Sequence, residues 1–489
     1  MMKFKLGVIT AIMSGLLVAC GGDGNGAGTD ATPANKSPVA NADFFNTVQG
    51  TSLSLDVLAN DIDPELGALS IKSAALAIAT QGSLSISSDK KLLNLAPSAD
   101  FVGDIVLSYT VIDAQGNQTI GQATVSVKSL QSLSAKQDST CVVTSTGLVK
   151  CWGGNDYGQL GEGVALNATN TFKTTPVTVA NLNGVKQVAM GYTHACAITQ
   201  TGAVSCWGDN NKGQLGDGTQ TQRLQATPVL GLAAKATQLA LSYDSSCALL
   251  ETGLVQCWGS NSQGELAIPS TTVFSASPKT LTIGSNLKAK RLVAGNHHVC
   301  VISENNSLFC WGANDNGQLG LNDKVRRYQA TQVTITGSVQ QVSAGFAHTC
   351  AANGSNVYCW GINDKGQLGI SNTTDAISPM LVTNLSGGVS SLALGKDHSC
   401  AVTTDNKTYC WGSRYAGQTA QTVDNTALDT QATQVSSLVG KRELSAGDFH
   451  TCSIEGAGLV KCWGKNDLGQ LANGSAAAQS ATPVSIIVD

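Results

Sequence analysis

The sequence has few charged residues for its length. Only 13% of its 489 residues are Asp, Glu, Lys or Arg, and the formal net charge is −4. A general nucleic-acid binder needs a basic face to neutralise phosphates, so this balance argues against that class of protein. The one basic cluster, KVRRY at residues 324–328, is interpreted as a solvated loop. We expect no nucleic acid among the partners.

Helical periodicity is also lacking. No run of useful length has a convincing helical repeat. Short stretches of small, β-branched and apolar residues alternate instead with Gly, Asn and Asp, and the chain contains 53 Gly. This pattern is typical of short strands joined by tight turns, so we predict an all-β protein.

A recurring catalytic set is lacking as well. No nucleophile, base and orienting group stand out together, and His residues occur about once per repeat. The segment GNDYGQLG (154–161) contains Asn and Asp but not the acidic spacing of a calcium loop, and these residues also tolerate tight turns. We therefore predict no catalytic residue and no cofactor here, although side chains of different repeats can still converge at one mouth of a ring.

What the sequence does contain is a cysteine repeat. The triplet CWG occurs seven times at intervals of 49–55 residues, and a second Cys precedes it by 10 residues, or by 9 in the fifth copy. These pairs use fourteen of the fifteen Cys, and all seven Trp lie in the triplets. The pairs are Cys141 and Cys151, Cys196 and Cys206, Cys247 and Cys257, Cys300 and Cys310, Cys350 and Cys359, Cys400 and Cys410, and Cys452 and Cys462.

Each copy has the rhythm of four short strands. In the second copy these are PVTV (176–179), VKQVAM (185–190), HACAIT (194–199) and AVSCWG (203–208). Four strands recurring about every 50 residues match a blade of a β-propeller, and blades must stack because one blade cannot bury both faces of its sheet. Seven such blades can close a ring.

The copies resemble the repeats of the regulator of chromosome condensation family. The resemblance is carried by VAMGYTHACAITQTGAVSCWGDNNKGQLGDG (188–218) and its fellows, such as VSAGFAHTCAANGSNVYCWGINDKGQLG (342–369), and it covers residues 131–489. That family forms seven-bladed propellers, so the resemblance implies the same fold. Copies three and six depart from GQLG, with the tails WGSNSQGELAI (258–268) and WGSRYAGQTAQ (411–421), which puts their last turn in doubt but not their blade.

The N-terminus predicts export. Residues 1–19 combine two Lys with an apolar run too short to span a membrane, which is typical of a signal peptide. LVAC (17–20) resembles the bacterial lipobox, and by that resemblance cleavage falls before Cys20, whose thiol then carries lipid. Residues 20–38 would form a flexible tether. No Asp follows Cys20, so we expect a lipoprotein anchored in the outer membrane of a Gram-negative cell.

Export decides the chemistry of the Cys pairs, because paired Cys outside the cytosol normally oxidise. A separation of 10 residues with a turn such as QTG (200–202) midway sets the two Cys opposite each other on adjacent antiparallel strands. Cα atoms at such non-hydrogen-bonded positions lie about 4.5 Å apart, which a disulfide can bridge. We predict one bridge within each of the seven pairs. In the fifth copy either a changed turn or a bulge must restore the register.

A His precedes the first Cys in five copies. The step HxC recurs at His194, His298, His348, His398 and His450. One His and two Cys can hold zinc, but copies one and three carry Ser139 and Ser245 at the His position and keep both Cys. We therefore predict structural His residues that hydrogen-bond between strands. His297 is the only His outside this register.

A separate unit occupies residues 39–128. Its strand candidates are PVANADFF (38–45), LDVLANDIDPE (55–65), GSLSI (82–86) and residues 101–127. Alternating strands and Gly/Asp turns favour a small β-sandwich, and the pattern is similar to bacterial cadherin-like or immunoglobulin-like repeats.

Such repeats often bind calcium through an acidic loop. This chain keeps Asn60, Asp61 and Asp63 but continues with PELG (64–67) and so lacks the later acidic residue. By that resemblance Asp61 and Asp63 are the candidate calcium ligands, and a capped turn is the alternative.

The leading functional hypothesis is a lipid-anchored, non-enzymatic interaction protein of the cell envelope. The sandwich would act as a spacer, and a propeller face would bind a protein or a surface polymer. The alternative is an extracellular lyase or hydrolase with its site at one propeller mouth. Acidic residues and His gathered at a mouth would favour the enzyme, whereas an aromatic or apolar patch there would favour the binder.

The chain ends suggest how the ring closes. A segment resembling TPV precedes the strand that leads to the first Cys in copies two to seven, and an unclaimed TPVSI lies at 482–486. If each such strand belongs to the following blade, the terminal strand joins the blade of Cys141 and Cys151 and pairs the two ends. If it belongs to the preceding blade, no exchange is needed. We predict the exchange.

Overall fold

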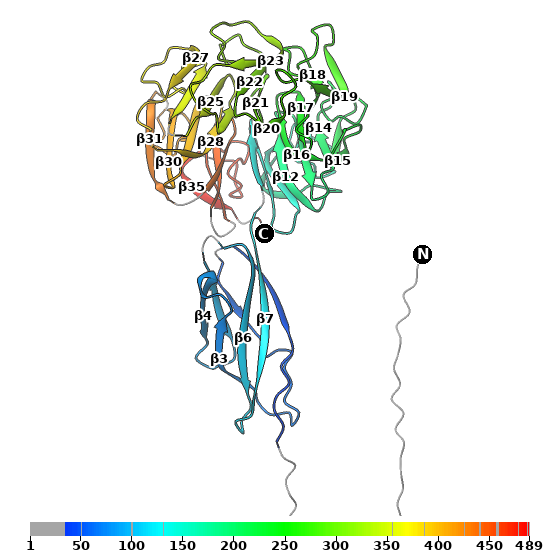
Figure 1. Ribbon diagram of the computed structural model, residues 1–489, viewed down its shortest axis with the longest axis vertical. Helices are drawn as coiled ribbons and strands as arrows, with labels where there is room; N and C mark the ends of the chain where they lie inside the picture. Colours follow the sequence, from blue (N-terminus) through cyan, green and yellow to red (C-terminus); the bar gives the residue numbers. More distant parts are fainter. Residues whose placement is uncertain are drawn as a thin grey trace, which may run out of the picture.

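The computed structural model describes residues 35–489, apart from 50, 99–100, 131, 355, 386, 425, 440–441, 456–458, 478, 487 and 489. The predicted signal peptide, Cys20 and most of the predicted tether lie outside these residues. Figure 1 shows a small body in blue to cyan below a larger one that runs to red. Within the described residues η1 (Ala79–Gln81) is the one helical element, so the chain is essentially all-β.

The small body is a sandwich of two sheets. Its strands are β1 (Asp43–Val48), β2 (Leu53–Leu55), β3 (Ser70–Leu76), β4 (Gly82–Ile86), β5 (Leu93–Pro97), β6 (Gly103–Ile112) and β7 (Gln118–Lys128). One sheet has the order β1-β7-β6-β3, with β1 parallel to β7, and the other has the order β2-β5-β4. Alternate residues of β6, from Ile105 to Val111, are fully buried between the sheets, as expected for strands with one core-facing side.

The strand candidates of the sandwich were partly wrong. Most of the 55–65 segment is turn, because Asn60, Asp61 and Pro64 favour turns over a ladder, and only its first residue belongs to β2. Strands β3 and β5 were not predicted.

The large body contains seven four-stranded sheets among the described residues. The first four are β8 (Ser132–Lys136), β9 (Ser139–Val143), β10 (Val149–Gly154) and β11 (Phe172–Thr178); β12 (Val185–Met190), β13 (His194–Thr199), β14 (Val204–Gly208) and β15 (Arg223–Pro228); β16 (Ala236–Leu241), β17 (Ser245–Leu250), β18 (Val255–Ser260) and β19 (Phe274–Leu281); and β20 (Ala289–Ala294), β21 (His298–Ser303), β22 (Leu308–Gly312) and β23 (Arg327–Val333).

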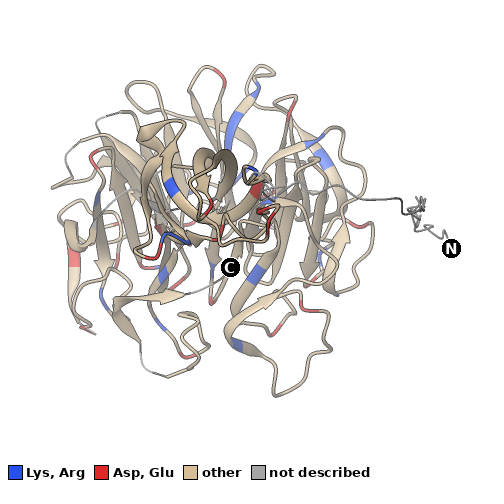
Figure 2. Cartoon of the chain, turned by 90° about the horizontal axis from the view of Figure 1, so that it is seen from below, with Lys and Arg blue, Asp and Glu red and all other residues tan. Residues whose placement is uncertain are grey.

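The other three are β24 (Gln341–Ala344), β25 (His348–Ala352), β26 (Val357–Gly361) and β27 (Ala376–Leu381); β28 (Val389–Leu394), β29 (His398–Thr403), β30 (Lys407–Ser413) and β31 (Leu428–Val439); and β32 (Arg442–Ala446), β33 (His450–Glu455), β34 (Leu459–Gly464) and β35 (Ser480–Ile486). The first strands of the sheets touch one another in cyclic order, and β32 touches β8, so the sheets form a closed ring. Figure 2, the view from below, shows acidic and basic segments interspersed around this ring.

The predicted closure by strand exchange is wrong. Strand β35 pairs with β34, with Cys462 opposite Val484, and therefore completes the blade of its own Cys pair. Each TPV-like strand likewise follows its CWG strand, so PVTV (176–179) overlaps β11 of the first blade and is not part of the second. The chain returns from each CWG strand through the GQLG turn to the outer edge of the same sheet, which decides the assignment.

All seven predicted disulfides are present. The bridged residues face each other directly across the second and third strands of each blade, with Cα atoms 4.0–4.2 Å apart. In the fifth blade the backbone N–H of Asn353 donates to the carbonyl of Asn356 (3.1 Å), whereas in the second blade Thr199 donates to Ala203 (2.9 Å). The turn is one residue shorter and the ladder is regular, so a changed turn, and not a bulge, restores the register.

The last turn survives in copies three and six, and also in the seventh copy, which reads GQLA at residues 469–472. The Ala267 N–H donates to the Gly264 carbonyl (3.0 Å), and Ala420 donates to Gly417 (2.9 Å). Both Ala residues take the left-handed conformation that Gly161 takes in the first copy, with φ of 51° and 55°. The doubt about these turns is therefore resolved in favour of the turn.

The seams between blades are built from buried hydrogen bonds. Each Trp is fully buried, and its indole N–H donates to a backbone carbonyl of the preceding blade, as Trp360 does to Gln318 (2.9 Å). In the same seam the Thr349 hydroxyl donates to that carbonyl (2.8 Å) and lies 2.9 Å from Nε2 of His298. Because the only hydroxyl proton is used, Nε2 of His298 carries the proton that fills this contact.

The five in-register His residues all bridge blades in this way. Their Nε2 atoms lie 2.7–2.9 Å from a hydroxyl of the next blade. The two exceptions are matched in the next blade: where Ser139 and Ser245 replace the His, the residues at the hydroxyl position are Ala195 and Val299, neither of which has a hydroxyl. A third position differs in the same two copies. The Gly that lies against the His ring in the other five copies is replaced by Lys136 in the first copy and by Ser242 in the third.

Candidate functional site

The propeller face opposite the sandwich, here called the far face, gathers the chemically distinctive side chains. The chain enters β8 from the sandwich side, so the turns after the first strands and the GQLG turns both lie on the far face (Figure 1). The residue after the Gly position of each first strand lies at the mouth of the central channel. In order around the ring these residues are Gln137, Tyr192, Tyr243, Asn296, Phe346, Lys396 and Asp448.

Aromatic rings cluster at this mouth. The ring of Tyr192 lies 5.2 Å from that of Tyr243 and 6.2 Å from that of Phe346, and Tyr243 lies 5.4 Å from His297. The Lys396 ammonium group lies over Phe346 at 5.1 Å, within cation–π range. Tyr243 keeps 38% of its surface exposed, so part of the cluster is open to a partner.

A polar bridge spans the mouth beneath the rings. The Tyr192 hydroxyl of the second blade donates to Oδ1 of Asp448 in the seventh blade (2.7 Å). Burial raises the pKa of Asp448 to about 6, and burial lowers the pKa of Lys136 to about 8. Lys136 occupies the position that is Gly in the five copies with an in-register His. Its Nζ donates to the Ala294 carbonyl (3.2 Å). At the far mouth these hydrogen bonds thus join the second blade to the seventh and the first blade to the fourth.

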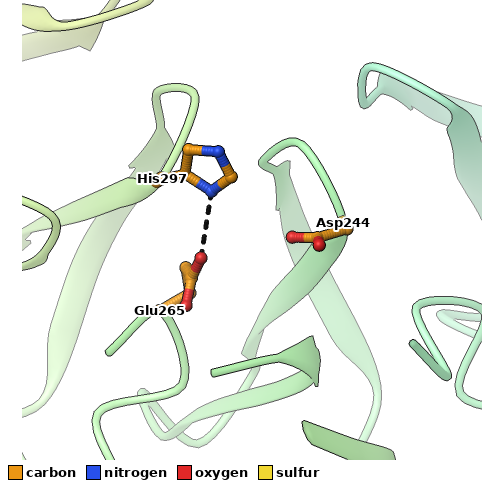
Figure 3. Close-up of side chains that lie close together, drawn as sticks. All are labelled: Asp244, Glu265 and His297. Atoms are coloured by element: carbon orange, nitrogen blue, oxygen red, sulfur yellow. Dashed lines mark hydrogen bonds and ion pairs between the residues drawn. The ribbon is translucent and has the colours of Figure 1, made fainter. Parts of the chain in front are cut away.

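An acidic and His cluster lies beside the rings. Asp244, Glu265 and His297 each offer a ligand atom, and these atoms all lie within 4.8 Å of one another. Figure 3 shows Nδ1 of His297 directed at Oε1 of Glu265, at 3.0 Å, with the Asp244 carboxylate on the neighbouring loop. Burial and the charge of Glu265 raise the pKa of Asp244, while His297 opposes them.

Glu265 occupies the position that is Gln in the other six copies. Like those Gln residues, it accepts the backbone N–H of the residue two positions before it, Gln263 (2.8 Å). In the seventh copy the side-chain amide N–H of Gln470 donates to Oδ1 of Asp138 (2.9 Å). Glu265 has a carboxylate oxygen in place of that amide, and this oxygen contacts His297. The third and fourth copies therefore have a carboxylate–imidazole contact where the seventh and first copies have an amide–carboxylate contact.

Sequence reasoning missed this cluster, although its signals were visible. Glu265 is the departure in the GELA tail, and His297 is the one His outside the register. Asp244 and His297 occupy the same position of adjacent copies, which the ring brings together. The far mouth thus carries both an aromatic patch and an acidic and His cluster.

The opposite mouth of the channel opens toward the sandwich. A cavity of about 580 Å³ lies there, lined by Gln49 of the sandwich and by Arg291 and Glu443 of the propeller, among others. Glu443 is exposed to the cavity, yet protein surrounds it on most sides, and this partial burial raises its pKa to about 7.

The three basic residues of the 324–328 segment, Lys324, Arg326 and Arg327, each form an ion pair with an Asp.

The candidate calcium ligands serve different hydrogen bonds. Oδ1 of Asp61 accepts the Asn41 N–H (2.8 Å), and Oδ1 of Asp63 accepts the Glu65 N–H (2.8 Å), which caps the turn. Oδ2 of Asp63 is buried without a hydrogen-bond partner among the described residues. No third His, Cys, Asp or Glu among those residues completes a cluster with Asp61 and Asp63. Calcium binding stays a prediction.

Comparison with known families supports both bodies of the fold. Residues 187–488 match the RCC1-like domain, and residues 131–159 and 146–198 match the regulator of chromosome condensation (RCC1) repeat. The chain belongs to the RCC1-like family. Residues 35–128 match the bacterial Ig domain, which agrees with the observed sandwich.

Individual relatives of this RCC1-like chain differ in size and role. The ultraviolet-B receptor UVR8 of Arabidopsis thaliana is 29% identical over 352 residues, which cover 70% of this chain and 78% of the receptor. The probable E3 ubiquitin-protein ligase HERC6 of Homo sapiens is 32% identical over 230 residues, or 45% of this chain, but the match covers only 22% of HERC6. Because most of HERC6 lies outside the match, its ligase activity is not assigned to this chain.

Among solved structures, Prp20p of Saccharomyces cerevisiae has a TM-score of 0.62 at 21% identity, covering 71% of this chain and 87% of Prp20p. That structure was described together with the binding of Prp20p to Gsp1p and histones. At this identity the likeness shows the fold alone. The described residues of the present chain contain no helix long and apolar enough to cross a membrane.

Proposed function

We propose that this RCC1-like chain is a lipid-anchored interaction protein of the bacterial cell envelope. It binds a protein or a surface polymer through the far face of its propeller. The observation that supports this proposal most is the aromatic cluster of Tyr192, Tyr243 and Phe346 at the far mouth. Partly exposed aromatic side chains with nearby cations are typical of the anchoring residues of interfaces.

The arrangement of the two bodies supports the choice of face. The sandwich lies on the near side of the ring (Figure 1), and the lipid predicted at Cys20 precedes it in the chain. A chain anchored in this way presents the far face away from the membrane, with the sandwich as the spacer. The match to a bacterial Ig domain agrees with a protein of the cell surface or envelope.

Site-specific photo-crosslinking tests the proposal. A photo-reactive amino acid at Tyr243, which is 38% exposed, is expected to capture an envelope component in living cells. The matched control is the same amino acid at Ile120 of the sandwich, which is 71% exposed. Equal products from both positions, or none from Tyr243, would contradict binding through the far face.

The His297–Glu265 pair favours a second candidate, an extracellular lyase or hydrolase. Glu265 holds Nδ1 of His297 at 3.0 Å and so orients the ring, which is how a general base is positioned. Purified chain incubated with envelope polymers would then release fragments, and His297→Ala would abolish the release. Equal release by the variant would contradict this candidate.

For the sandwich we propose a calcium ion held by Asp61 and Asp63. The buried, unpartnered Oδ2 of Asp63 supports this proposal. Calcium titration by calorimetry is expected to give one saturable site that Asp63→Asn removes, and heat unchanged by that substitution would contradict it.

A further inference from the structure

We infer that Asp244, Glu265 and His297 form a binding site for a divalent transition-metal ion, with Zn²⁺ as the best match. The site joins the third and fourth blades on the far face (Figure 3). One imidazole nitrogen and two carboxylate oxygens are a ligand set that zinc uses where a further position stays open. The inference does not depend on the proposed binding partner.

The spacing of the ligand atoms fits such an ion. Ligands about 2.1 Å from a tetrahedral zinc ion lie roughly 3.4 Å from one another. Nδ1 of His297 and Oε1 of Glu265 are 3.0 Å apart, and the Asp244 oxygen lies within 4.8 Å of both. The required separation of roughly 3.4 Å lies between the 3.0 Å contact and the 4.8 Å limit.

Unpartnered buried oxygens provide an independent indication. Oδ1 of Asp244 is buried and has no hydrogen-bond partner among the described residues, and the same holds for Oε1 of Gln263 and Oδ1 of Asn296. Asn296 is only 8% exposed, and it lines a cavity of about 220 Å³ together with Gln263 and His297. A buried acceptor without a donor is costly, and a cation bound by Asp244 would satisfy its Oδ1 directly.

The charges of the cluster point the same way. Glu265 is fully buried, and the Asp244 carboxylate lies close to it, so two acidic groups share a site with one imidazole. Buried charges in proteins are paired or coordinate metal ions.

The remaining copies supply an internal control. The other six have Gln at the position of Glu265, and none of them combines an acidic residue there with a His at the position of His297. The other His and Cys of the described blades are already engaged, because the fourteen Cys are bridged and the five in-register His are fully buried. The difference between a titration of the wild type and one of Glu265→Gln therefore reports on this cluster and not on the proposed site at Asp61 and Asp63.

The test is calorimetric titration of the full mature chain in detergent with ZnCl₂. We expect one zinc ion per chain, and at least a 10-fold weaker affinity in both Glu265→Gln and His297→Ala. Glu265→Gln restores the residue of the other copies, so it is expected to fold even if His297→Ala does not. The matched control is Asp397→Asn, at the position equivalent to Asp244 in the sixth blade, which should bind zinc like the wild type.

X-ray absorption of the zinc-loaded wild-type chain gives a second readout. We expect only nitrogen and oxygen neighbours, including one imidazole, at about 2.0–2.1 Å. No saturable binding at 100 µM zinc, sulfur in the coordination shell, or unchanged affinity in Glu265→Gln would overturn the inference.

Discussion

The blade seams allow a sharp test of how the ring is held together. Thr349→Val removes one hydroxyl and keeps the side-chain shape. It leaves Nε2–H of His298 without its acceptor at 2.9 Å, and the Gln318 carbonyl loses a donor at 2.8 Å. A buried donor left unpaired costs about 1–3 kcal/mol, so we expect the free energy of unfolding to fall by that amount.

The chain itself contains the compensated version of this seam. Between the third and fourth blades Ser242 and Ser245 stand at the Gly and His positions, with hydroxyls 2.6 Å apart, and Val299 stands at the hydroxyl position. The triple variant Gly295→Ser, His298→Ser, Thr349→Val rebuilds that arrangement. Gly295→Ser alone should be severe, because a Cβ there would overlap the His298 ring and also the Gly345 carbonyl oxygen. In the triple variant the ring is gone, so the loss should be smaller than the sum of the single losses.

Tryptophan fluorescence in guanidinium chloride, with the disulfides intact, measures these losses in the propeller alone. All seven Trp lie in the blades, and the sandwich contains none. Wild-type stability in Thr349→Val would refute the proposed seam hydrogen bonds, and strict additivity in the triple variant would refute the compensation between the three positions.

Three further predictions concern pH, the bridges and the anchor. Burial lowers the pKa of His194, His298, His348 and His398 to about 3 and that of His450 to about 4. These residues therefore give stability that is complete above pH 6.5 and is lost as the pH falls toward the folded-state pKa. The free energy of unfolding falls by about 1.4 kcal/mol for each His at pH 5.5. Glu443 and Asp448 partly offset this loss, because their raised pKa values favour proton uptake in the folded state. An unfolding midpoint that stays constant from pH 7.5 to 5 would contradict this prediction. Replacing both Cys350 and Cys359 by Ala should lower the free energy of unfolding by about 2–3 kcal/mol, since the bridge closes a short loop, and an unchanged midpoint would count against it. Mass spectrometry of the mature N-terminus should find lipid on Cys20, and an unmodified Cys20 in the wild type would argue against the anchor.

The repeat made the main features of the propeller predictable. Seven ordered Cys pairs specify both the number of blades and the bridges, because the distance between the Cys residues sets the hairpin register. The far-mouth cluster was harder to predict, since Glu265 and His297 belong to different blades and each appears in the sequence only as a departure from a pattern. Such departures become informative when copies are compared column by column, as with Ser139 and Ala195 across a seam. The contacts of Tyr192 with Asp448 join positions far apart in the sequence, and only the closed ring brings them together.

The closure of the ring was mispredicted because a periodic sequence has no natural starting point. A repeat of four strands can be divided before or after any of them, and the TPV segment fits either choice. The turn at the GQLG position decides, since in the seventh copy this turn, GQLA (469–472), follows β34 and leads to β35, which pairs with β34. The last seam then uses the same contacts as the others: His450 meets Thr140 at 2.8 Å, and the Trp152 indole donates to the Gln470 carbonyl at 2.9 Å. The backbone N–H of Asp448 also donates to the Gln137 carbonyl (2.8 Å). In the described part of the chain, therefore, the first and last blades are joined by these contacts and not by a shared strand. These buried contacts hold the first and last blades together without strand exchange.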